Sequence, residues 1–213
     1  MPRTQPFDTY LDAYEAWFEK HRYVYLSELE AIRHFLPKDG KGIEIGIGTG
    51  RFALPFGIIE GVEPSAKMRA LAAQRGLTVH EGVAENLPLE DQSFDFALMV
   101  TTVCFVDDIV LSFRELRRIL KPNGKFVIGM VDKDSPLGKE YEKIKSASQF
   151  YRIATFYSTN EIVGYLNEAG FGDIEIVQTI FGDLKSIHEI QPFKTGYGDG
   201  GFAAIRAKKL LWL

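Results

Sequence analysis

The chain reads Gly42-Ile43-Glu44-Ile45-Gly46-Ile47-Gly48-Thr49-Gly50 over residues 42–50, and this stretch decides the fold. An apolar run that ends in closely spaced glycines predicts a strand, a tight turn and a helix start whose free backbone amides face a ligand. Glu63 follows the next short apolar run, where a carboxylate can accept hydrogen bonds from a ribose. The stretch therefore predicts a nucleotide-binding turn.

The spacing of the glycines bears on which nucleotide is bound. A dinucleotide fingerprint, G-x-G-x-x-G, that began at Gly46 would need glycine or alanine at position 51, where this chain has Arg51. The spacing here is G-x-G-x-G, which argues against NAD and related dinucleotides.

Composition is typical of one globular domain. The 213 residues are 46% hydrophobic, enough to bury a substantial core, and their formal net charge of −4 gives no reason to expect stable binding to nucleic acid. A single cysteine, Cys104, excludes a disulfide framework and a cysteine-rich metal site, and we expect no metal. Neither an apolar stretch of membrane-spanning length nor a signal-peptide pattern is present, so we expect a cytoplasmic protein without a membrane partner.

Helical periods alternate with short apolar runs, which is typical of a parallel sheet covered by helices on both faces. The expected strands span residues 42–47, 58–62, 78–81, 94–100 and 125–131, followed by a pair at 174–180 and 202–207 that we expect to be antiparallel because no clear helix joins them. Expected helices span residues 66–75, 107–120, 137–150 and 158–170, with Asp107 as one N-cap and Ser158 opening a capping box. Pro55 predicts an unusually short first crossover helix.

Two helices precede the sheet. The first carries an aromatic stripe at helical spacing, made of Phe7, Tyr10, Leu11, Tyr14, Trp17, Phe18 and His21. The second spans residues 25–36 and ends before Pro37. Such a stripe is usually core packing, and the alternative is a lid over a ligand site.

Five segments, in order and beginning with the glycine turn itself, resemble a known family. They are residues 43–50 (IEIGIGTG), 62–65 (VEPS), 82–88 (GVAENLP), 93–95 (SFD) and 119–124 (ILKPNG). Together they are similar to class I S-adenosylmethionine-dependent methyltransferases, of the branch that acts mostly on small molecules. The resemblance implies an α/β fold, a Rossmann-like three-layer sandwich with a seven-stranded, mostly parallel sheet whose last strand is antiparallel, preceded by N-terminal helices.

The resemblance also implies a division of one methyltransferase domain, residues 1–213. A helical lid would span residues 1–37 and a cofactor-binding core residues 40–132. A substrate-side insert would span residues 133–157, and the C-terminal helix with the antiparallel strand pair residues 158–213.

Carried over onto this chain, the family's motifs imply an S-adenosylmethionine site. Its residues would be Glu44, Gly46, Gly48 and Gly50 around the methionine part, Glu63 on the ribose, Pro64, Met68, Gly82, Val83, Ala84 and Glu85 around the adenine, and Thr101, Thr102 and Phe105 where donor and acceptor meet. Val83 departs from the pattern, because many relatives have aspartate there. We expect Glu85 or backbone groups to substitute, or a weaker affinity for the cofactor.

The acceptor site is expected over the carboxyl ends of the fourth and fifth strands, covered by the leading helix, the insert and the late loop. Candidate substrate-side residues are Tyr10, Tyr14, Trp17 and His21. Methyl transfer by in-line displacement requires alignment and desolvation more than acid–base chemistry, so no catalytic residue is assigned. The implied partner is a small-molecule methyl acceptor, while the acceptor and the oligomeric state are left open. The alternatives are an NAD(P)-dependent oxidoreductase and a non-catalytic domain of the same fold.

Overall fold

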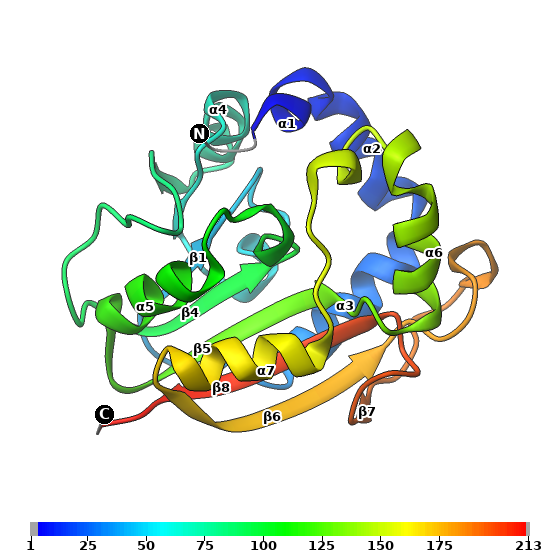
Figure 1. The fold of residues 1–213 in the computed structure, drawn as a ribbon. Coiled ribbons are helices and arrows are strands. Elements are labelled where there is room, and N and C mark those ends of the chain that lie inside the picture. Colours follow the sequence, from blue (N-terminus) through cyan, green and yellow to red (C-terminus); the bar gives the residue numbers. More distant parts are fainter. Residues whose placement is uncertain (1–3, 212–213) are drawn as a thin grey trace.

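The computed structural model describes residues 4–211, which are built on a sheet of eight strands in the order β3-β2-β1-β4-β5-β8-β6-β7 (Figure 1). The strands are β1 (Gly42–Ile45), β2 (Glu60–Val62), β3 (Thr78–His80), β4 (Phe94–Val100), β5 (Leu120–Val131), β6 (Phe171–Thr179), β7 (Lys194–Thr195) and β8 (Phe202–Lys209). The helices are α1 (Gln5–Thr9), α2 (Leu11–Lys20), α3 (Arg22–Arg33), α4 (Ala66–Gln74), α5 (Ile109–Ile119), α6 (Pro136–Ile144) and α7 (Thr159–Glu168).

The pairing of the strands confirms the predicted α/β class. Strands β3, β2, β1, β4 and β5 are mutually parallel, whereas β8 is antiparallel to both β5 and β6. The predicted antiparallel pair is therefore present as β6 and β8, and the last strand lies between β5 and β6. The sheet has one strand more than predicted, because the two-residue β7 pairs with the outer edge of β6.

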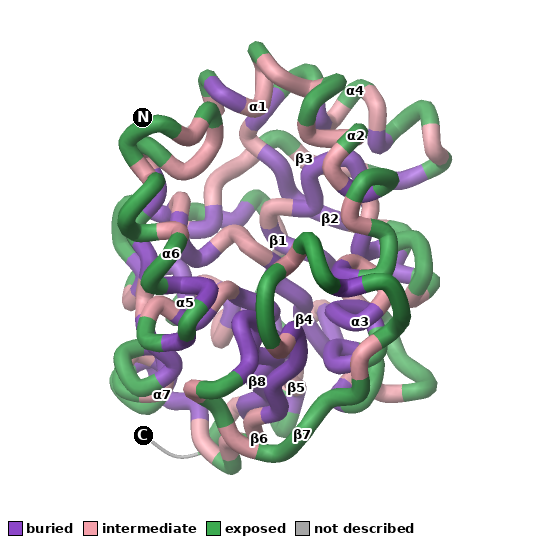
Figure 2. Tube along the Cα trace, turned by 90° about the vertical axis from the view of Figure 1, so that its right-hand side faces the viewer, coloured by how far each residue is buried: buried purple, intermediate pink, exposed green. Residues whose placement is uncertain are grey.

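Helices cover both faces of the sheet. Helices α5 and α7 pack together on one face, and α3 packs on β5, β6 and β8 on the other. Each residue of β4 after Asp95 is buried, which explains why this strand reads as a continuous apolar run. Figure 2 shows the central strands in the buried colour beneath largely exposed outer turns.

The N-terminal segment has more helix breaks than the helical spacing of its aromatic residues predicts. Tyr10 and His21 have non-helical backbone angles, so the expected first helix is divided into α1 and α2, and the second begins at Arg22 and ends at Arg33. The breaks let the pieces contact different partners: α1 lies against α4, and α2 against α3. In Figure 1, α2 and α6 lie beyond the arrowheads of β4 and β6.

Two other predicted helices differ from the structure. Asp108, not Asp107, is the N-cap of α5, since the Asp108 carboxylate accepts a hydrogen bond from the Leu111 amide at 2.9 Å. The expected helix 137–150 ends at Ile144 and continues as the 3-10 turns Lys145–Ala147 and Tyr151–Ile153. The polar sequence of residues 145–149 offers no apolar face to continue the helix.

The capping box and the short crossover agree with the prediction. Ser158 and Glu161 exchange both side-chain hydrogen bonds at the start of α7. The first crossover is reduced to one 3-10 turn, Leu54–Phe56. The glycine turn is contacted instead from α2, whose Glu15 accepts a hydrogen bond from Thr49.

Candidate functional site

The glycine turn after β1 adopts a backbone that other residues would not accept. Gly46 and Gly48 have φ values of 71° and 56°. A Cβ at Gly46 would lie 2.3 Å from the Thr102 hydroxyl oxygen, and one at Gly48 would lie 3.1 Å from the Tyr14 hydroxyl oxygen. Glycine is therefore required here both by the backbone conformation and by close neighbours.

Glu63 links this turn to the end of β2. Its carboxylate is buried and accepts hydrogen bonds from the Gly48 amide at 3.0 Å and the Ser65 amide at 2.8 Å. Burial raises the pKa of Glu63 to about 7, against the lowering effect of the Ser65 and Gly48 amides. The two sequence motifs that predict the nucleotide site are thus joined through one side chain.

Glu44 lies in β1 directly before the turn and is 2% exposed. Burial raises its pKa well above the ordinary value; the Ala53 amide lowers the pKa, and the charge of Glu63 raises it further. Its Oε2 atom has no hydrogen-bond partner among the described residues. A buried polar oxygen with no partner is costly, and the raised pKa favours the protonated form of this carboxyl group.

A cavity of about 560 Å³ opens beside the turn, within the range of ordinary ligand pockets. It is lined by most of the sequence-predicted site residues, namely Gly46, Gly48, Glu63, Pro64, Met68, Gly82, Val83, Ala84, Glu85, Thr101, Thr102, Phe105, Tyr14 and Trp17. Four others lie off its wall: Glu44, Gly50, Tyr10 and His21. Thr101, which lines the cavity directly after β4, has a φ of 49°, rare for a β-branched residue.

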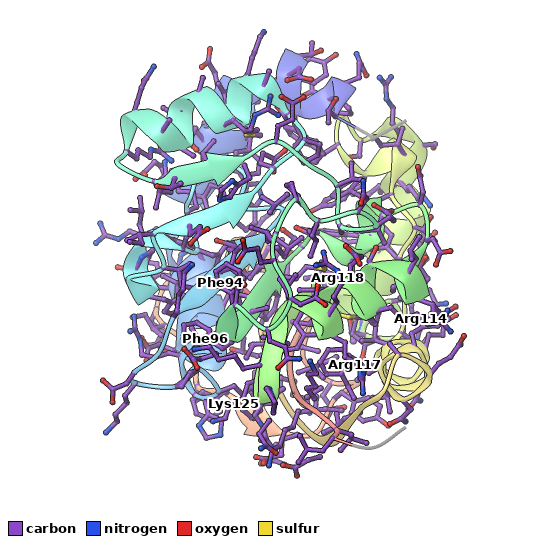
Figure 3. All side chains as sticks on the ribbon, turned by 90° about the vertical axis from the view of Figure 1, so that its left-hand side faces the viewer. Phe94, Phe96, Arg114, Arg117, Arg118 and Lys125 are labelled. Atoms are coloured by element: carbon purple, nitrogen blue, oxygen red, sulfur yellow. The ribbon has the colours of Figure 1, made fainter. Side chains whose placement is uncertain are left out.

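Side chains of α5 form hydrogen bonds with the backbone of the loop after β3. Arg118 donates to the Leu87 and Leu89 carbonyls at 3.0 and 2.7 Å, and the Glu115 carboxylate accepts from the Leu87 amide at 2.9 Å. Figure 3 labels Arg118 with Arg114 and Arg117 along this helix. These bonds fix the segment that follows Gly82, Val83, Ala84 and Glu85.

Glu85 already has protein partners. Its Oε1 atom accepts from the backbone amides of Asp107 and Asp108 at 2.6 and 3.2 Å, directly before α5. Glu85 lines the cavity and ties the loop to α5 through the same carboxylate. Its other oxygen accepts no hydrogen bond within residues 4–211 and can face a ligand.

Glu15 of α2 was not identified from the sequence. Its carboxylate accepts from Thr49 at 2.5 Å, from Arg51 at 2.6 and 3.0 Å, and from Arg75. Burial alone would raise the pKa of Glu15, but the hydrogen bonds from Arg75, Arg51 and Thr49 together hold it below the ordinary value. Its partners lie 34 to 60 positions away in the chain, so no local sequence pattern could have identified Glu15.

Aromatic rings from α1, α6 and residues 150–151 line the cavity. The Phe7 ring centroid lies 5.0 Å from that of Phe105 and 5.7 Å from that of Phe150, and Tyr141 and Tyr151 are 5.2 Å apart. Of the predicted stripe, Phe7, Tyr14, Trp17 and Phe18 line the cavity, and Phe18 is also buried in the core, whereas Tyr10 and His21 do not line it.

The sequence also missed Glu28, Leu184 and Phe202, which line the cavity. Burial raises the pKa of Glu28 to about 8. The available signal was an acid inside the apolar face formed by Val24 and Ile32, four residues to either side.

Residues 4–211 contain no group of three or more His, Cys, Asp and Glu side chains arranged to hold a metal ion. Over the same residues, no helix has both the length and the apolar character needed to cross a membrane.

The chain resembles known proteins over almost its whole length. The family model of a methyltransferase domain matches residues 43–128. A crystal structure of a Thermotoga maritima protein, described as an S-adenosylmethionine-dependent methyltransferase and possible histamine N-methyltransferase, is 51% identical, with a TM-score of 0.94 over 97% of this chain and 99% of that one.

Two uncharacterized proteins are also similar in sequence. One from Methanocaldococcus jannaschii is 44% identical over 204 residues, 96% of this chain and 98% of the relative. One from Mycobacterium tuberculosis is 34% identical over 80% of this chain and 61% of its own length. On this likeness and the matched domain, the chain belongs to the class I S-adenosylmethionine-dependent methyltransferases.

Proposed function

We propose that this protein transfers a methyl group from S-adenosylmethionine to a small-molecule acceptor inside the 560 Å³ cavity. The observation that carries the proposal is the arrangement of Gly46, Gly48 and Glu63 at one part of a cavity whose other lining residues are mostly apolar or aromatic. A polar cradle for the donor then adjoins a dry space for the acceptor.

The residues present fit this cofactor. Gly46 and Gly48 line the cavity without side chains, so a ligand can approach the backbone of the turn, and the Glu63 carboxylate lines the same cavity, whereas Glu44 lies off its wall. Glu63 would accept from the ribose hydroxyls, with Pro64, Met68 and the segment 82–85 around the adenine. Thr101, Thr102 and Phe105 would line the point where donor and acceptor meet.

S-adenosylmethionine supplies a methyl group that is already activated. The chain's own part is to align the acceptor, exclude water and close the site. Helices α1 and α2 would serve as the lid, because Glu15 ties α2 to the glycine turn and Asp8 ties α1 to Ser65 at 2.6 Å. The proposed lid therefore contacts the donor loops directly.

The cofactor is tested by thermal denaturation. S-adenosylmethionine and S-adenosylhomocysteine should raise the melting temperature, while NAD should not. At a ligand concentration of one hundred times Kd, the added free energy of unfolding is about 2.7 kcal/mol. No shift with either cofactor form at saturation would refute the proposal, and a shift with NADH alone would favour the oxidoreductase. Tyr141 and Lys145 have the Tyr-x-x-x-Lys spacing of one oxidoreductase class, but Lys145 does not line the cavity.

The acceptor is tested by turnover with S-adenosylmethionine. The names of relatives suggest three probes: histamine from the Thermotoga structure, phosphoethanolamine from a Caenorhabditis elegans N-methyltransferase 28% identical to this chain, and a demethylmenaquinone from a Staphylococcus epidermidis enzyme 25% identical. Any turnover excludes the non-catalytic alternative. Cofactor binding without turnover over a broad panel would support it.

A further inference from the structure

Glu28 is a buried carboxyl group with no hydrogen-bond or ion-pair partner among the described residues. It lies in the middle of α3, is 6% exposed, and lines the cavity together with Val24 one turn before it. Within residues 4–211, its carboxylate makes no hydrogen bond and no ion pair. Ile32, one turn after it, is fully buried against the sheet. A valine or leucine at position 28 would continue this apolar face without the cost of burying a carboxyl group.

The surroundings of Glu28 are aromatic. Tyr25 of the same helix, Tyr141 of α6 and Tyr151 of the insert are the titratable groups close enough to interact with its charge. All three have pKa values raised by burial, so they stay neutral. No cation therefore compensates the carboxylate when it ionises, and a buried acid in such a pocket is a candidate for ligand chemistry.

Glu28 and the proposed donor residues lie at different halves of the strand order, on either side of β4. Helix α3 packs on β5, β6 and β8, whereas Glu63 and Gly82 follow β2 and β3 beyond β1 and β4. Thr101 and Thr102 follow β4, between the two groups. Glu28 thus belongs to the acceptor part of the cavity.

The charge of the cavity has one sign. Its ionisable lining residues, apart from tyrosine, are Glu28, Glu63, Glu85 and Asp107, and none of its described lining residues is lysine, arginine or histidine. An anionic acceptor such as a phosphate ester would meet no positive partner. A cation is attracted both by the carboxylates and by the aromatic faces.

We propose, building on the methyltransferase function above, that Glu28 binds the nitrogen of an amine acceptor and removes its proton before methyl transfer. The acceptor is a primary or secondary amine on an apolar or aromatic body. Glu28 is then a catalytic residue, and its unpaired burial is explained by the ligand that completes the pair.

The step balances in atoms and charge. An acceptor R–NH3⁺ gives one proton to the Glu28 carboxylate and becomes R–NH2. The freed electron pair on nitrogen forms the bond to the methyl carbon while the carbon–sulfur bond of the donor breaks, its electrons remaining on sulfur. The product is R–NH2⁺–CH3, and Glu28 loses its proton to water when the product leaves.

The test compares Glu28→Gln with the matched control Glu30→Gln. Gln has the same shape as Glu but no charge, and Glu30 is an exposed residue of the same helix whose carboxylate pairs with Arg33. Each protein is saturated with S-adenosylhomocysteine and titrated with a panel of aryl-alkyl amines, including histamine and 2-phenylethylamine, and with the matched alcohols. Turnover is measured on the same panel with S-adenosylmethionine.

In the wild-type protein and Glu30→Gln, we expect amines to bind and to be methylated in preference to the alcohols. In Glu28→Gln, we expect kcat/KM for the amine to fall at least about 100-fold, as for loss of a general base, and the acid limb of its pH profile to disappear. Glu28→Asp should restore part of the rate and the acid limb.

Three results would overturn the inference while the protein still binds S-adenosylhomocysteine: no amine binds or reacts, alcohols react in preference to amines, or Glu28→Gln keeps the rate and the pH profile. Failure to bind S-adenosylhomocysteine would instead refute the methyltransferase function itself. The two failures are thus distinguished by the cofactor titration alone.

Discussion

Glu15 and Arg51 form an ion pair, with Nη2 of Arg51 2.6 Å from Oε2 of Glu15, which fastens the leading helix α2 to the glycine turn. Arg51 occupies the position at which a dinucleotide turn would require a small residue. The same arginine lies 5.2 Å from the Phe18 ring centroid. Arg51, which argues against a dinucleotide in the sequence, thus fastens the proposed lid over the proposed S-adenosylmethionine site.

Breaking this pair should loosen α2. Glu15→Gln leaves Arg51 and Arg75 without their shared carboxylate, and we expect the free energy of unfolding in urea to fall by about 1–3 kcal/mol at pH 7. Since the Glu15 pKa is lowered in the folded protein, its contribution is present above the ordinary pKa of 4.5 and is lost as the pH falls through the folded value. The wild type should therefore approach the mutant at low pH.

Glu19→Gln is the control for Glu15→Gln. The Glu19 side chain is 72% exposed and contacts Arg51 at 3.2 Å, so we expect a change below about 0.5 kcal/mol. Equal losses in the two variants would show that Glu15 is an ordinary surface acid.

Gly46 should tolerate no side chain. Gly46→Ala incurs the cost of positive φ, about 1–2 kcal/mol, and a contact of 2.3 Å with Thr102, which overpacking data put at about 1–3 kcal/mol more. Gly57 has nearly the same φ, 69°, with no atom within 4 Å of an added Cβ. The difference in unfolding free energy between Gly46→Ala and Gly57→Ala measures the steric part, and equal values would contradict it.

Cofactor affinity should depend on the ionisation of Glu63. Because its pKa is raised to about 7, we expect the affinity for S-adenosylhomocysteine, measured by calorimetry, to fall as the pH drops from 8 to 6. Glu63→Gln should bind about 1–3 kcal/mol more weakly at pH 8 and lose this pH dependence. Glu81→Gln, an exposed acid after β3, is the control, and unchanged affinity in Glu63→Gln would show that the ribose lies elsewhere.

Glu28 should destabilise the unliganded protein at alkaline pH. Its pKa is about 8 in the folded protein against 4.5 ordinarily, so the folded state retains the proton more tightly, and stability falls as the pH rises from about 4.5 to 8. Glu28→Gln should remove this slope and be more stable above pH 8, by a few kcal/mol at most. Urea unfolding of the wild type and of Glu28→Gln at pH 5 and pH 8.5 measures this change of stability with pH. The same change in both proteins would contradict the burial of a titrating carboxyl group at position 28.

Much of the donor side could be predicted from the sequence because its demands are local. Gly46 and Gly48 are needed because the turn has positive φ angles at these two positions. Glu63 accepts hydrogen bonds from the amides of Gly48, 15 residues before it, and Ser65, two residues after it. The alternation of apolar runs likewise identified the strands, since burial on both faces leaves a direct trace in β4.

Predictions failed where the chain has no local constraint. Asp107 and Asp108 are equivalent N-cap candidates by pattern. In the structure Asp108 is the N-cap, and the amides of both residues donate to Glu85, a residue of another loop. The division of the aromatic stripe at Tyr10 and His21 likewise depends on which neighbours α1 and α2 contact. Short-range periodicity contains no information on such contacts.

The sequence by itself determined the sheet, the glycine turn and the family, because strand burial and positive φ angles restrict the residue types at each position. The tertiary structure alone decided what covers the turn and what faces the acceptor. Glu15 meets Arg75 across 60 residues, and Glu28 joins Tyr141 and Phe202 at one cavity from distant parts of the chain. These neighbours are created by packing between elements, so an acid at position 28 becomes significant only once the fold has enclosed it without a partner.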